Sequence, residues 1–337
     1  MSTPARVTAY TAASTRLSLL SDHALAGLVA GAAPRGTGIG GTRAELDLDG
    51  TKVFLKRIPL TDLERRPEHV RSTANLFGLP LFYQYGLGSA GFGAWRELAA
   101  HLMTTNWVLS GACDGFPLLY HWRVLPDTPS GDYLSEEAID RFLGRWDGSP
   151  AVRQRLEALG AASASVVVFL EHVPQTLAEW LTGRRDAEPY QWAARELARV
   201  AVFLRERGMV HFDGHMNNIL TDGRRLLFAD FGLASSLDFE LAPAEAAFVT
   251  EHLTYDEVFA MSQVLRYAIE AVRGERTAEE FAVAWQAGDR TGTPAGLATL
   301  LDRHLGDARI LHHFHRNLLE HDLRTPFPAE LRPRSLT

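Results

Sequence analysis

Apolar and polar side chains alternate along residues 43–48, residues 51–58 are rich in residues that favour strands, and the dipeptide Asp49-Gly50 lies between the two stretches. A period of two is typical of a half-buried strand, and Asp-Gly is typical of a type I′ hairpin turn. We therefore predict a β-hairpin. Residues 117–125 predict another strand, and the apolar run at 165–173 predicts a buried one.

Helical spacing dominates much of the remaining chain. A helix is predicted at 94–108, where Trp95, Leu98, Leu102 and Thr105 share one stripe. Capping residues or apolar spacing predict further helices at 22–31, 176–182, 190–207 and from Thr254 onward, with short strand-like runs at 218–220 and 226–229. The order, strands with one helix and then mostly helices, indicates an α+β fold.

Residues 126–165 interrupt the first, strand-rich part. Ser135 is a typical N-cap residue, and Ser149-Pro150 places a proline at the first position of a second helix. We interpret the segment as an inserted helical pair. It is either a packing brace or an element that helps to determine which molecule the protein accepts, through a cleft or a dimer contact.

Composition narrows the classes of protein. A length of 337 residues favours two lobes or one large domain, and 46% hydrophobic with 22% charged residues is ordinary globular composition. The net charge of -7 argues against nucleic acid as a partner. The single cysteine, Cys113, allows no internal disulfide, which favours a cytoplasmic setting. Neither a signal peptide nor an apolar run of about 18 residues is found, so we expect no membrane partner.

Two features in the first part of the chain suggest phosphate binding. Gly36, Gly38 and Gly41 satisfy the pattern G-x-G-x-x-G, in which residues without side chains let backbone N–H groups approach phosphate oxygens. Lys56 follows on the predicted strand Val53-Phe54-Leu55. Taken alone, such a glycine pattern is more often an ordinary loop, and a lysine in an otherwise apolar strand is more often an edge or snorkelling residue.

Two later motifs are more specific. His211 to Asn218 has the form H-x-D-x-x-x-x-N, and Asp230-Phe231-Gly232 follows twelve residues after Asn218. Phosphoryl transfer requires a carboxylate that accepts the proton of the attacking hydroxyl, and oxygen ligands for the metal ions that bridge phosphate oxygens. The alternative is that Asp213 and Asp230 are turn residues.

In this order, the four features resemble the protein-kinase-like superfamily over roughly residues 34–270. The resemblance implies a bilobal fold with an N-lobe at 1–172, which holds the helical insertion, and a helical C-lobe at 173–337. It implies ATP and Mg²⁺ as cofactors. It also implies the following roles: phosphate contacts from Gly36, Gly38, Gly41 and Lys56, catalysis by Asp213, and Mg²⁺ ligation by Asn218 and Asp230.

Three further assignments depend on the same resemblance. Glu97 is the expected helix partner of Lys56, with Glu64 and Glu68 as rivals on the intervening segment. Glu171 and Val173 lie where the connection between the lobes would present backbone groups to adenine. Asp256 matches the helix aspartate that braces the catalytic loop by hydrogen bonds.

The branch of the superfamily remains open. His215 follows Asp213 by two residues, as in aminoglycoside and choline phosphotransferases, whereas protein kinases usually have lysine there. Asp230-Phe231-Gly232 and Ala242-Pro243-Ala244-Glu245 are similar to protein-kinase motifs, but only nine residues, 233–241, separate them. We expect phosphoryl transfer from ATP to a hydroxyl of a small molecule. The alternatives are a Ser/Thr protein kinase and a nucleotide-binding pseudokinase scaffold.

Overall fold

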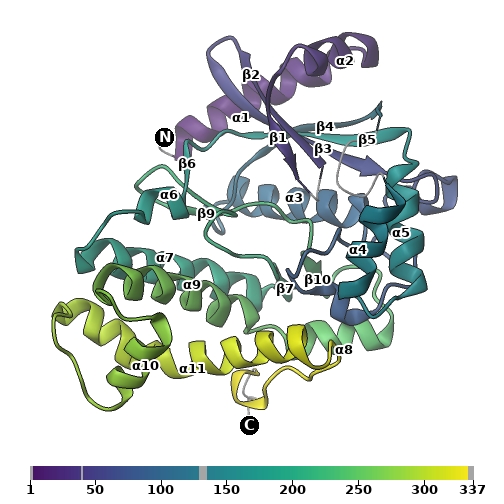
Figure 1. The fold of residues 1–337 in the computed structure, drawn as a ribbon. Helices are drawn as coiled ribbons and strands as arrows, with labels where there is room; N and C mark the ends of the chain where they lie inside the picture. The colour runs from purple at the N-terminus through teal and green to yellow at the C-terminus, as the bar shows by residue number, and fades with distance from the viewer. Residues whose placement is uncertain (1–2, 39–40, 129–134, 333–337) are drawn as a thin grey trace. The chain divides into compact units, whose positions relative to one another are not determined.

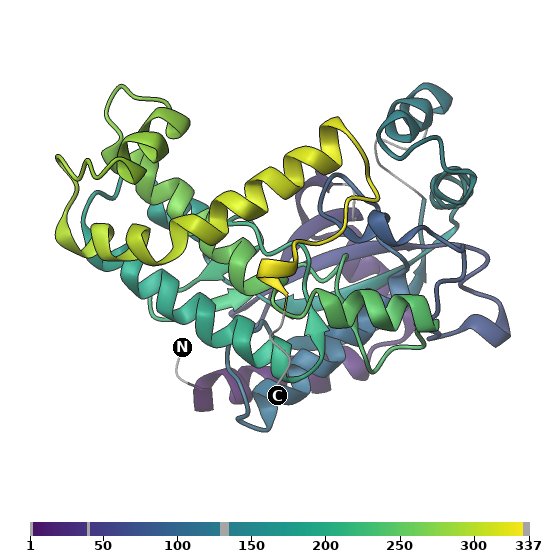
Figure 2. The same ribbon diagram turned by 90° about the horizontal axis from the view of Figure 1, so that it is seen from below.

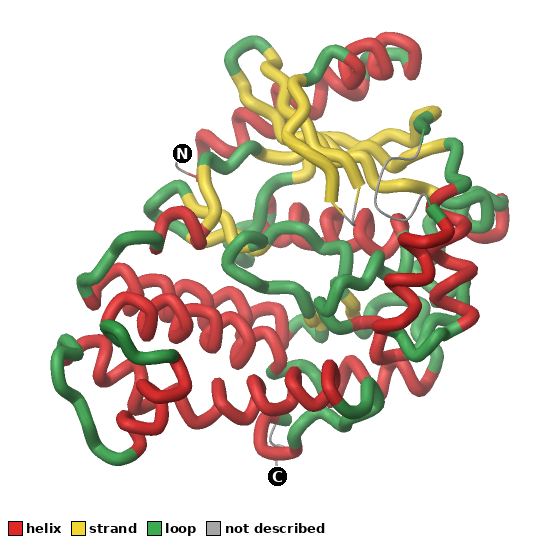
Figure 3. The backbone as a smooth tube through the Cα atoms, viewed as in Figure 1, coloured by secondary structure: helices red, strands yellow, loops and turns green. Residues whose placement is uncertain are grey.

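The computed structural model describes residues 3–38, 41–128 and 135–332, and the chain forms two compact units. The first unit comprises Met1–Val173 and Asp230–Phe248, and the second comprises Pro174–Ala229 and Val249–Thr337. The chain thus passes between the units three times. The first unit contains a five-stranded antiparallel sheet and the second is mainly helical, so the predicted α+β class is confirmed (Figures 1 and 3).

The sheet of the first unit has the strand order β1-β2-β3-β5-β4. Its strands are β1 (Ala33–Gly38), β2 (Gly41–Leu48), β3 (Thr51–Leu60), β4 (Leu119–Pro126) and β5 (Ala164–Glu171). Asp49 and Gly50 join β2 to β3 with φ of 51° and 86°, the positive values that a type I′ turn requires. The predicted hairpin is confirmed.

One face of the sheet packs against helix α3 (Ala94–Leu109). Strand β5 lies between β3 and β4, and all eight of its residues are buried, as its apolar run predicts. Trp95, Leu98 and Thr105 of the predicted helical stripe are also buried. The core between sheet and helix consists of Ile58, Leu60, Ala94, Trp95, Leu98, Leu119, Val166, Val168 and Leu170.

Helices α1 (Thr3–Ser18) and α2 (Asp22–Ala30) pack against β4. Helix α2 is the predicted one, and Ser21 caps it by accepting from Ala24 N. Helix α1 was not predicted, because it is rich in Ser, Thr and Ala and its buried face combines the charged Arg6 with Ala13 and Leu17. Its main anchor is a buried arginine, Arg6, which is 1% exposed.

The predicted helical pair lies between β4 and β5 as α4 (Glu136–Arg145) and α5 (Pro150–Gly160). Ser135 caps α4, and Pro150 stands in the first turn of α5. Residues 129–134 of the predicted insertion lie outside the described residues. The connection from β3 to α3, which the sequence left unassigned, contains the 3₁₀ turns η1 (Pro67–His69) and η2 (Leu81–Gln84).

The second unit is built on three helices that pack on one another, α7 (Ala187–Glu206), α9 (Tyr255–Val272) and α11 (Ala295–Glu320) (Figure 2). A small antiparallel sheet has the order β6 (Gln175–Thr176), β8 (Ile219–Thr221) and β9 (Leu226–Phe228). The remaining elements are α6 (Leu177–Leu181), β7 (Met209–Val210), α10 (Ala278–Gln286) and η3 (Ala329–Leu331). The helices predicted at 176–182 and 190–207 are confirmed, and the helical prediction from Thr254 onward is confirmed as far as Glu320, where α11 ends.

Two short elements follow Asp230 in the sequence. They are β10 (Ser235–Ser236) and α8 (Pro243–Glu251), and α8 contains the residue at which the chain leaves the first unit for the last time. None of the helices in the described ranges is long and apolar enough to cross a membrane.

Candidate active site

Lys56 of β3 contacts two carboxylates. Its Nζ lies 2.6 Å from Glu97 Oε1 of α3 and 2.6 Å from Asp230 Oδ1. Burial alone would lower the pKa of Lys56, but the charges of Asp230 and Glu97 outweigh it and raise the pKa. The lysine is therefore a charged group held at a defined position inside the first unit.

The two rival glutamates lie elsewhere. Glu64 accepts from Thr61, Ala94 and Arg155, and Glu68 is exposed in the 3₁₀ turn η1. Glu97 is the residue that reaches Lys56 although 41 positions separate the two in the sequence. The additional length of the connection is taken up by the turns between β3 and α3.

Asp230 is held by its own neighbours in the motif. Its φ of 64° is unusual for a residue other than glycine, and such backbone needs support from its surroundings. The fully buried ring of Phe231 supplies that support, since its centroid is 5.0 Å from His101 of α3 and 6.2 Å from Phe116. The side chain of Asp230 remains 27% exposed.

A second cation, which the sequence analysis did not single out, faces Asp230. Arg43 Nη2 lies 3.8 Å from Asp230 Oδ2, while Lys56 occupies the side of Oδ1. Arg43 and Lys56 are directly paired across β2 and β3, so their side chains share one face of the sheet. The hairpin register contained this signal, because a two-residue turn at 49–50 places position 43 opposite position 56.

The glycine motif is divided between two strands. Gly36 and Gly38 belong to β1, Gly41 begins β2, and Ile39 and Gly40 lie outside the described residues. A Cβ at Gly41 would lie 1.9 Å from the carbonyl oxygen of Arg57, so strand packing alone requires glycine there. Phosphate contact by Gly36, Gly38 and Gly41 stays a prediction.

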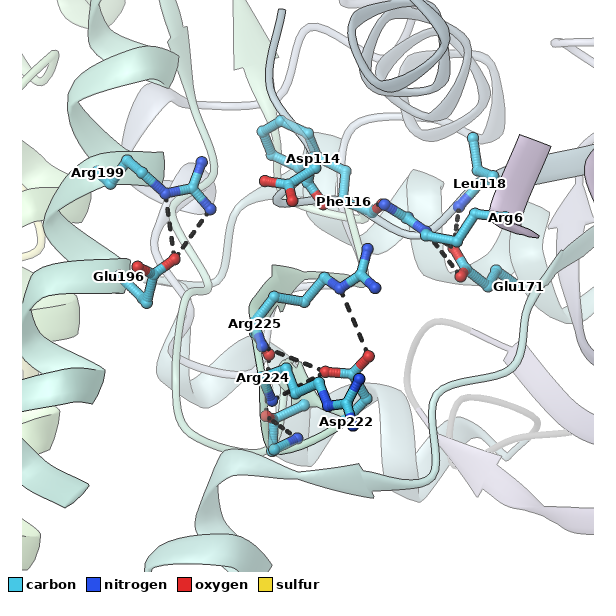
Figure 4. Close-up of polar contacts among 12 residues, drawn as sticks. Arg6, Asp114, Phe116, Leu118, Glu171, Glu196, Arg199, Asp222, Arg224 and Arg225 are labelled. Carbon is cyan, nitrogen blue, oxygen red and sulfur yellow. Dashed lines mark hydrogen bonds and ion pairs between the residues drawn. The ribbon is translucent and has the colours of Figure 1, made fainter. Parts of the chain in front are cut away.

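Glu171, at the end of β5, is engaged by α1. Arg6 Nε and Nη2 donate to its carboxylate at 2.8 and 2.6 Å, and Leu118 N donates to it at 3.1 Å (Figure 4). The remaining Arg6 donors reach the carbonyls of Asp114 and Phe116 at 3.1 and 2.6 Å. The carboxylate of Glu171 is thus a structural group. A backbone contact of Glu171 or Val173 with adenine stays a prediction.

In the second unit, the H-x-D-x-x-x-x-N loop brings Asp213 and Asn218 together. Asn218 Nδ2 donates to both the carbonyl oxygen and Oδ2 of Asp213 at 3.0 Å. His215 Nε2 lies 3.8 Å from Asp213 Oδ1. Two turn hydrogen bonds of 2.8 Å, His215 N to Asp213 O and Asn218 N to His215 O, close the loop, which explains the fixed spacing of the motif.

Asp256, the second residue of α9, fixes the start of this loop. Its carboxylate accepts from His211 N at 2.6 Å and from Phe212 N at 3.0 Å, as predicted for the bracing aspartate. Phe212 is fully buried with φ of 63°, so the two hydrogen bonds hold a strained backbone next to Asp213. Burial raises the pKa of Asp256 to about 7, although the two backbone N–H groups oppose the shift.

Each unit carries an oxygen donor of the kind that Mg²⁺ takes. In the first unit this donor is the carboxylate of Asp230. In the second unit the amide nitrogen of Asn218 donates to Asp213, which leaves its amide oxygen as the donor. Ligation of Mg²⁺ by Asn218 and Asp230 stays a prediction. Within the described ranges, no three His, Cys, Asp or Glu residues form a ready-made metal cluster.

No protein-family model matches the chain, and no curated protein matches its sequence. The functional assignment therefore depends on the residues described above and on their geometry.

Proposed function

We propose that the chain is an ATP- and Mg²⁺-dependent phosphotransferase of the protein-kinase-like superfamily, which transfers the γ-phosphoryl group to a hydroxyl of a small molecule. The observation that carries the proposal is the buried Lys56, held between Glu97 and Asp230. A five-stranded antiparallel sheet with α3 packed on one face, followed by a mainly helical unit, supports the finer fold assignment.

Each residue then has a separate task. Lys56 orients the α- and β-phosphates, and Glu97 keeps its ammonium group in place. Asp213 orients the acceptor hydroxyl and accepts its proton as the new O–P bond forms and the bond to the β-phosphate oxygen breaks. Asn218 and Asp230 hold Mg²⁺, which when bound neutralises the negative charge of the phosphate oxygens.

The segment after Asp230 supports a small-molecule acceptor over a protein. Gln84 Nε2 donates to the carbonyl of Leu233, and Arg96 of α3 forms an ion pair of 2.8 Å with Glu245. Glu240 N donates to Thr73 Oγ1 at 2.8 Å. Residues 233–241 are thus hydrogen-bonded near both ends to other parts of the first unit. Nine residues held in this way are too few to form the peptide-binding platform of a protein kinase.

The experiment measures ATP consumption with a panel of hydroxylated small molecules and with generic protein substrates. We expect turnover with a small-molecule hydroxyl. Turnover with protein substrates alone would replace the proposal by the Ser/Thr protein kinase, and nucleotide binding without any turnover would replace it by the pseudokinase scaffold.

Two variants assign the carboxylates. Asp213→Asn is expected to abolish transfer and leave ATP binding largely intact, because this carboxylate serves the acceptor and not the nucleotide. Asp230→Asn is expected to weaken both Mg²⁺-dependent ATP binding and turnover. Asp238→Asn, an exposed carboxylate eight residues further along, is the matched control. Turnover near the wild-type rate in either of the first two variants would contradict the role given to that residue.

A further inference from the structure

Glu64 connects three elements of the first unit through one buried carboxylate. It is 1% exposed and lies in the connection after β3. Its Oε2 accepts from Thr61 N at 3.0 Å, from Thr61 Oγ1 at 2.6 Å and from Arg155 Nη1 at 2.8 Å, while its Oε1 accepts from Ala94 N at 2.7 Å. Donors from the end of β3, the start of α3 and the middle of α5 therefore share this carboxylate.

The positions of these donors relate Glu64 to the candidate active site. Thr61 directly follows β3, which carries Lys56, and Ala94 is the first residue of α3, which carries Glu97 one turn later. Gly93 has no side chain to cap α3, so the carboxylate of Glu64 satisfies a free N–H and faces the positive end of the helix dipole. Trp95 Nε1 also donates to the carbonyl of Glu64 at 2.8 Å. Glu64 thus fixes α3 against β3.

The positive partner of Glu64 comes from the inserted helical pair. Arg155 of α5 is 2% exposed, and its guanidinium lies 5.1 Å from the ring centroid of Phe77. Within the described residues its Nε has no hydrogen-bond partner. A buried ion pair with an incompletely satisfied member contributes little to stability beyond what apolar residues would supply. Packing alone does not explain this pair.

Other contacts of the helical pair reach the same connection. Arg145 Nη1 donates to the carbonyl of Leu87 at 2.8 Å. Trp146 is fully buried, with its ring centroid 4.7 Å from that of Tyr83 and 6.4 Å from that of Phe82. Figure 1 shows α4 and α5 side by side next to the end of the sheet. The insertion therefore packs along residues 61–93, the stretch that determines where α3 begins.

We propose that Glu64 and Arg155 are positioning residues. The Arg155–Glu64 ion pair holds α3 against β3 and so maintains the contact between Glu97 and Lys56. Through this contact the inserted helices control the affinity for the nucleotide. This inference rests on the proposed function, because it takes Lys56 as the phosphate-binding group.

The test measures the dissociation constant of Mg²⁺-ATP by calorimetry. Arg155→Met keeps an unbranched apolar stem and removes the guanidinium group with its charge, and we expect the dissociation constant to rise about tenfold, a factor that corresponds to about 1.4 kcal/mol. Arg155→Lys should restore part of the affinity. The matched control is Arg153→Met on the same helix, where the arginine is 39% exposed and pairs with Asp140, and it should leave the affinity unchanged.

A double-mutant cycle separates positioning from general stability. If Arg155 acts through Glu97, then in a Glu97→Gln background the substitution Arg155→Met should no longer change the dissociation constant. The proposal would be overturned if the two substitutions raised the dissociation constant independently, so that their factors multiply in the double variant. It would also be overturned if Arg153→Met raised the dissociation constant as much as Arg155→Met. Should Arg155→Met fail to fold, the variant Glu64→Gln/Arg155→Met removes both buried charges and takes its place in the same cycle.

Amide hydrogen exchange, measured without nucleotide, tests the coupling of Arg155 to α3 independently of the proposed function. The amides of Ala94 to Leu98 should exchange about tenfold faster in Arg155→Met than in wild type, and at the wild-type rate in Arg153→Met. If the wild type binds no nucleotide, the proposed function fails while this coupling is still measured. Unchanged exchange at the start of α3 would refute the coupling even in an active phosphotransferase.

Discussion

At the scale of single residues, three of the buried ion pairs in the first unit join segments that are far apart in the sequence. They are Lys56–Glu97, Glu64–Arg155 and Arg6–Glu171, whose partners lie 41, 91 and 165 positions apart in the sequence. Removing a charged side chain from water is costly, and the cost is offset only where the partner and further hydrogen bonds satisfy it. Removal of one partner therefore leaves a buried charge without compensation.

Arg6 gives the clearest measurement of that cost. Arg6→Ala should lower the free energy of unfolding by about 3–5 kcal/mol, because Glu171 would keep a buried carboxylate with Leu118 N as its remaining described donor. Chemical denaturation monitored by circular dichroism measures the change. Arg16→Ala on the same helix is the control, since Arg16 is 45% exposed and pairs with the exposed Asp49.

A double variant distinguishes charge from packing. Arg6→Met/Glu171→Gln removes both charges and should recover most of the stability lost in Arg6→Ala. If Arg6→Ala lowers the free energy of unfolding no more than Arg16→Ala does, the Arg6–Glu171 ion pair does not anchor α1.

The same three pairs show which residues the sequence could reveal. Glu97 was predictable, because the resemblance to the protein-kinase-like superfamily implies that a helix glutamate pairs with the strand lysine. Arg6 was not, because nothing near it in the sequence indicates a partner 165 positions away. Arg43 was predictable in principle from the hairpin register, whereas Arg155 required knowledge of how the inserted helices pack.

At the scale of elements, α9 connects the loop of Asp213 to the rest of the second unit. Asp256, at the start of α9, holds the loop, and the hydroxyl of Tyr255 lies 2.9 Å from His315 Nε2 of α11. Burial raises the pKa of Asp256 from its ordinary 3.8 to about 7. Burial, with a smaller effect of His312, lowers the pKa of His315 from 6.5 to about 4.

These two shifts give opposite dependences of stability on pH. The folded state binds a proton at Asp256 more tightly than the unfolded state, so this contribution to stability is present below about pH 4 and is lost as the pH rises through 7. At His315 the unfolded state binds the proton more tightly, so its contribution is present above about pH 6.5 and is lost as the pH falls to 4. Between these limits the two effects oppose each other.

We predict that single substitutions expose each effect. The free energy of unfolding of Asp256→Asn minus that of wild type should rise with pH between about 4 and 6.5, by up to about 1.4 kcal/mol per pH unit. For His315→Gln the same difference from wild type should fall with pH over this range. Chemical denaturation of the variants across this range measures both slopes.

The exposed His313, on the same helix as His315, provides the control. His313→Gln should leave the pH dependence as in wild type. Slopes of the same sign in Asp256→Asn and His315→Gln would contradict the assignment of opposite protonation effects.

Elements were predictable wherever side-chain periodicity alone decides the structure. The β2–β3 hairpin, α3 and the inserted helices follow from alternation, helical spacing and capping residues. The buried face of helix α1 contains an arginine and an alanine beside Leu17, so it shows no clear apolar pattern. Residues 61–93 are held by Glu64 and by aromatic packing, which leave no periodic pattern. The glycine motif indicated a loop, yet Gly36 and Gly38 belong to a strand, because glycine permits the bulge between Pro34 and Gly36.

At the scale of the whole molecule, the chain returns to the first unit after Asp230. This return at residues 230–248 was not predictable from a division of the chain into two consecutive halves. The bonds that hold it, from Gln84, Thr73 and Arg96, come from residues at least 149 positions away in the sequence. Periodicity contains no information on contacts of that range, and none of these three contacts was predicted from the motifs.

The same segment bears on how activity is controlled. In switches that depend on phosphorylation, the added phosphate orders a loop by pairing with arginines. Here Ser235 and Ser236, the two serines between Gly232 and Ala242, are 1% and 0% exposed. The segment is also already held in place by Arg96, which pairs with Glu245 at 2.8 Å. Neither the accessible hydroxyl nor the unordered loop that such a switch needs is present in this described stretch.

We therefore predict that activity requires no phosphorylation between Gly232 and Ala242. Protein treated with a phosphatase should turn over ATP as fast as untreated protein, and mass spectrometry should find Ser235 and Ser236 unmodified. Ser235→Ala and Ser236→Ala should retain turnover, whereas Ser235→Asp should reduce it, because a buried carboxylate without a partner would disturb the segment that follows Asp230. A large loss of activity on phosphatase treatment, restored by rephosphorylation at either serine, would favour the protein-kinase alternative.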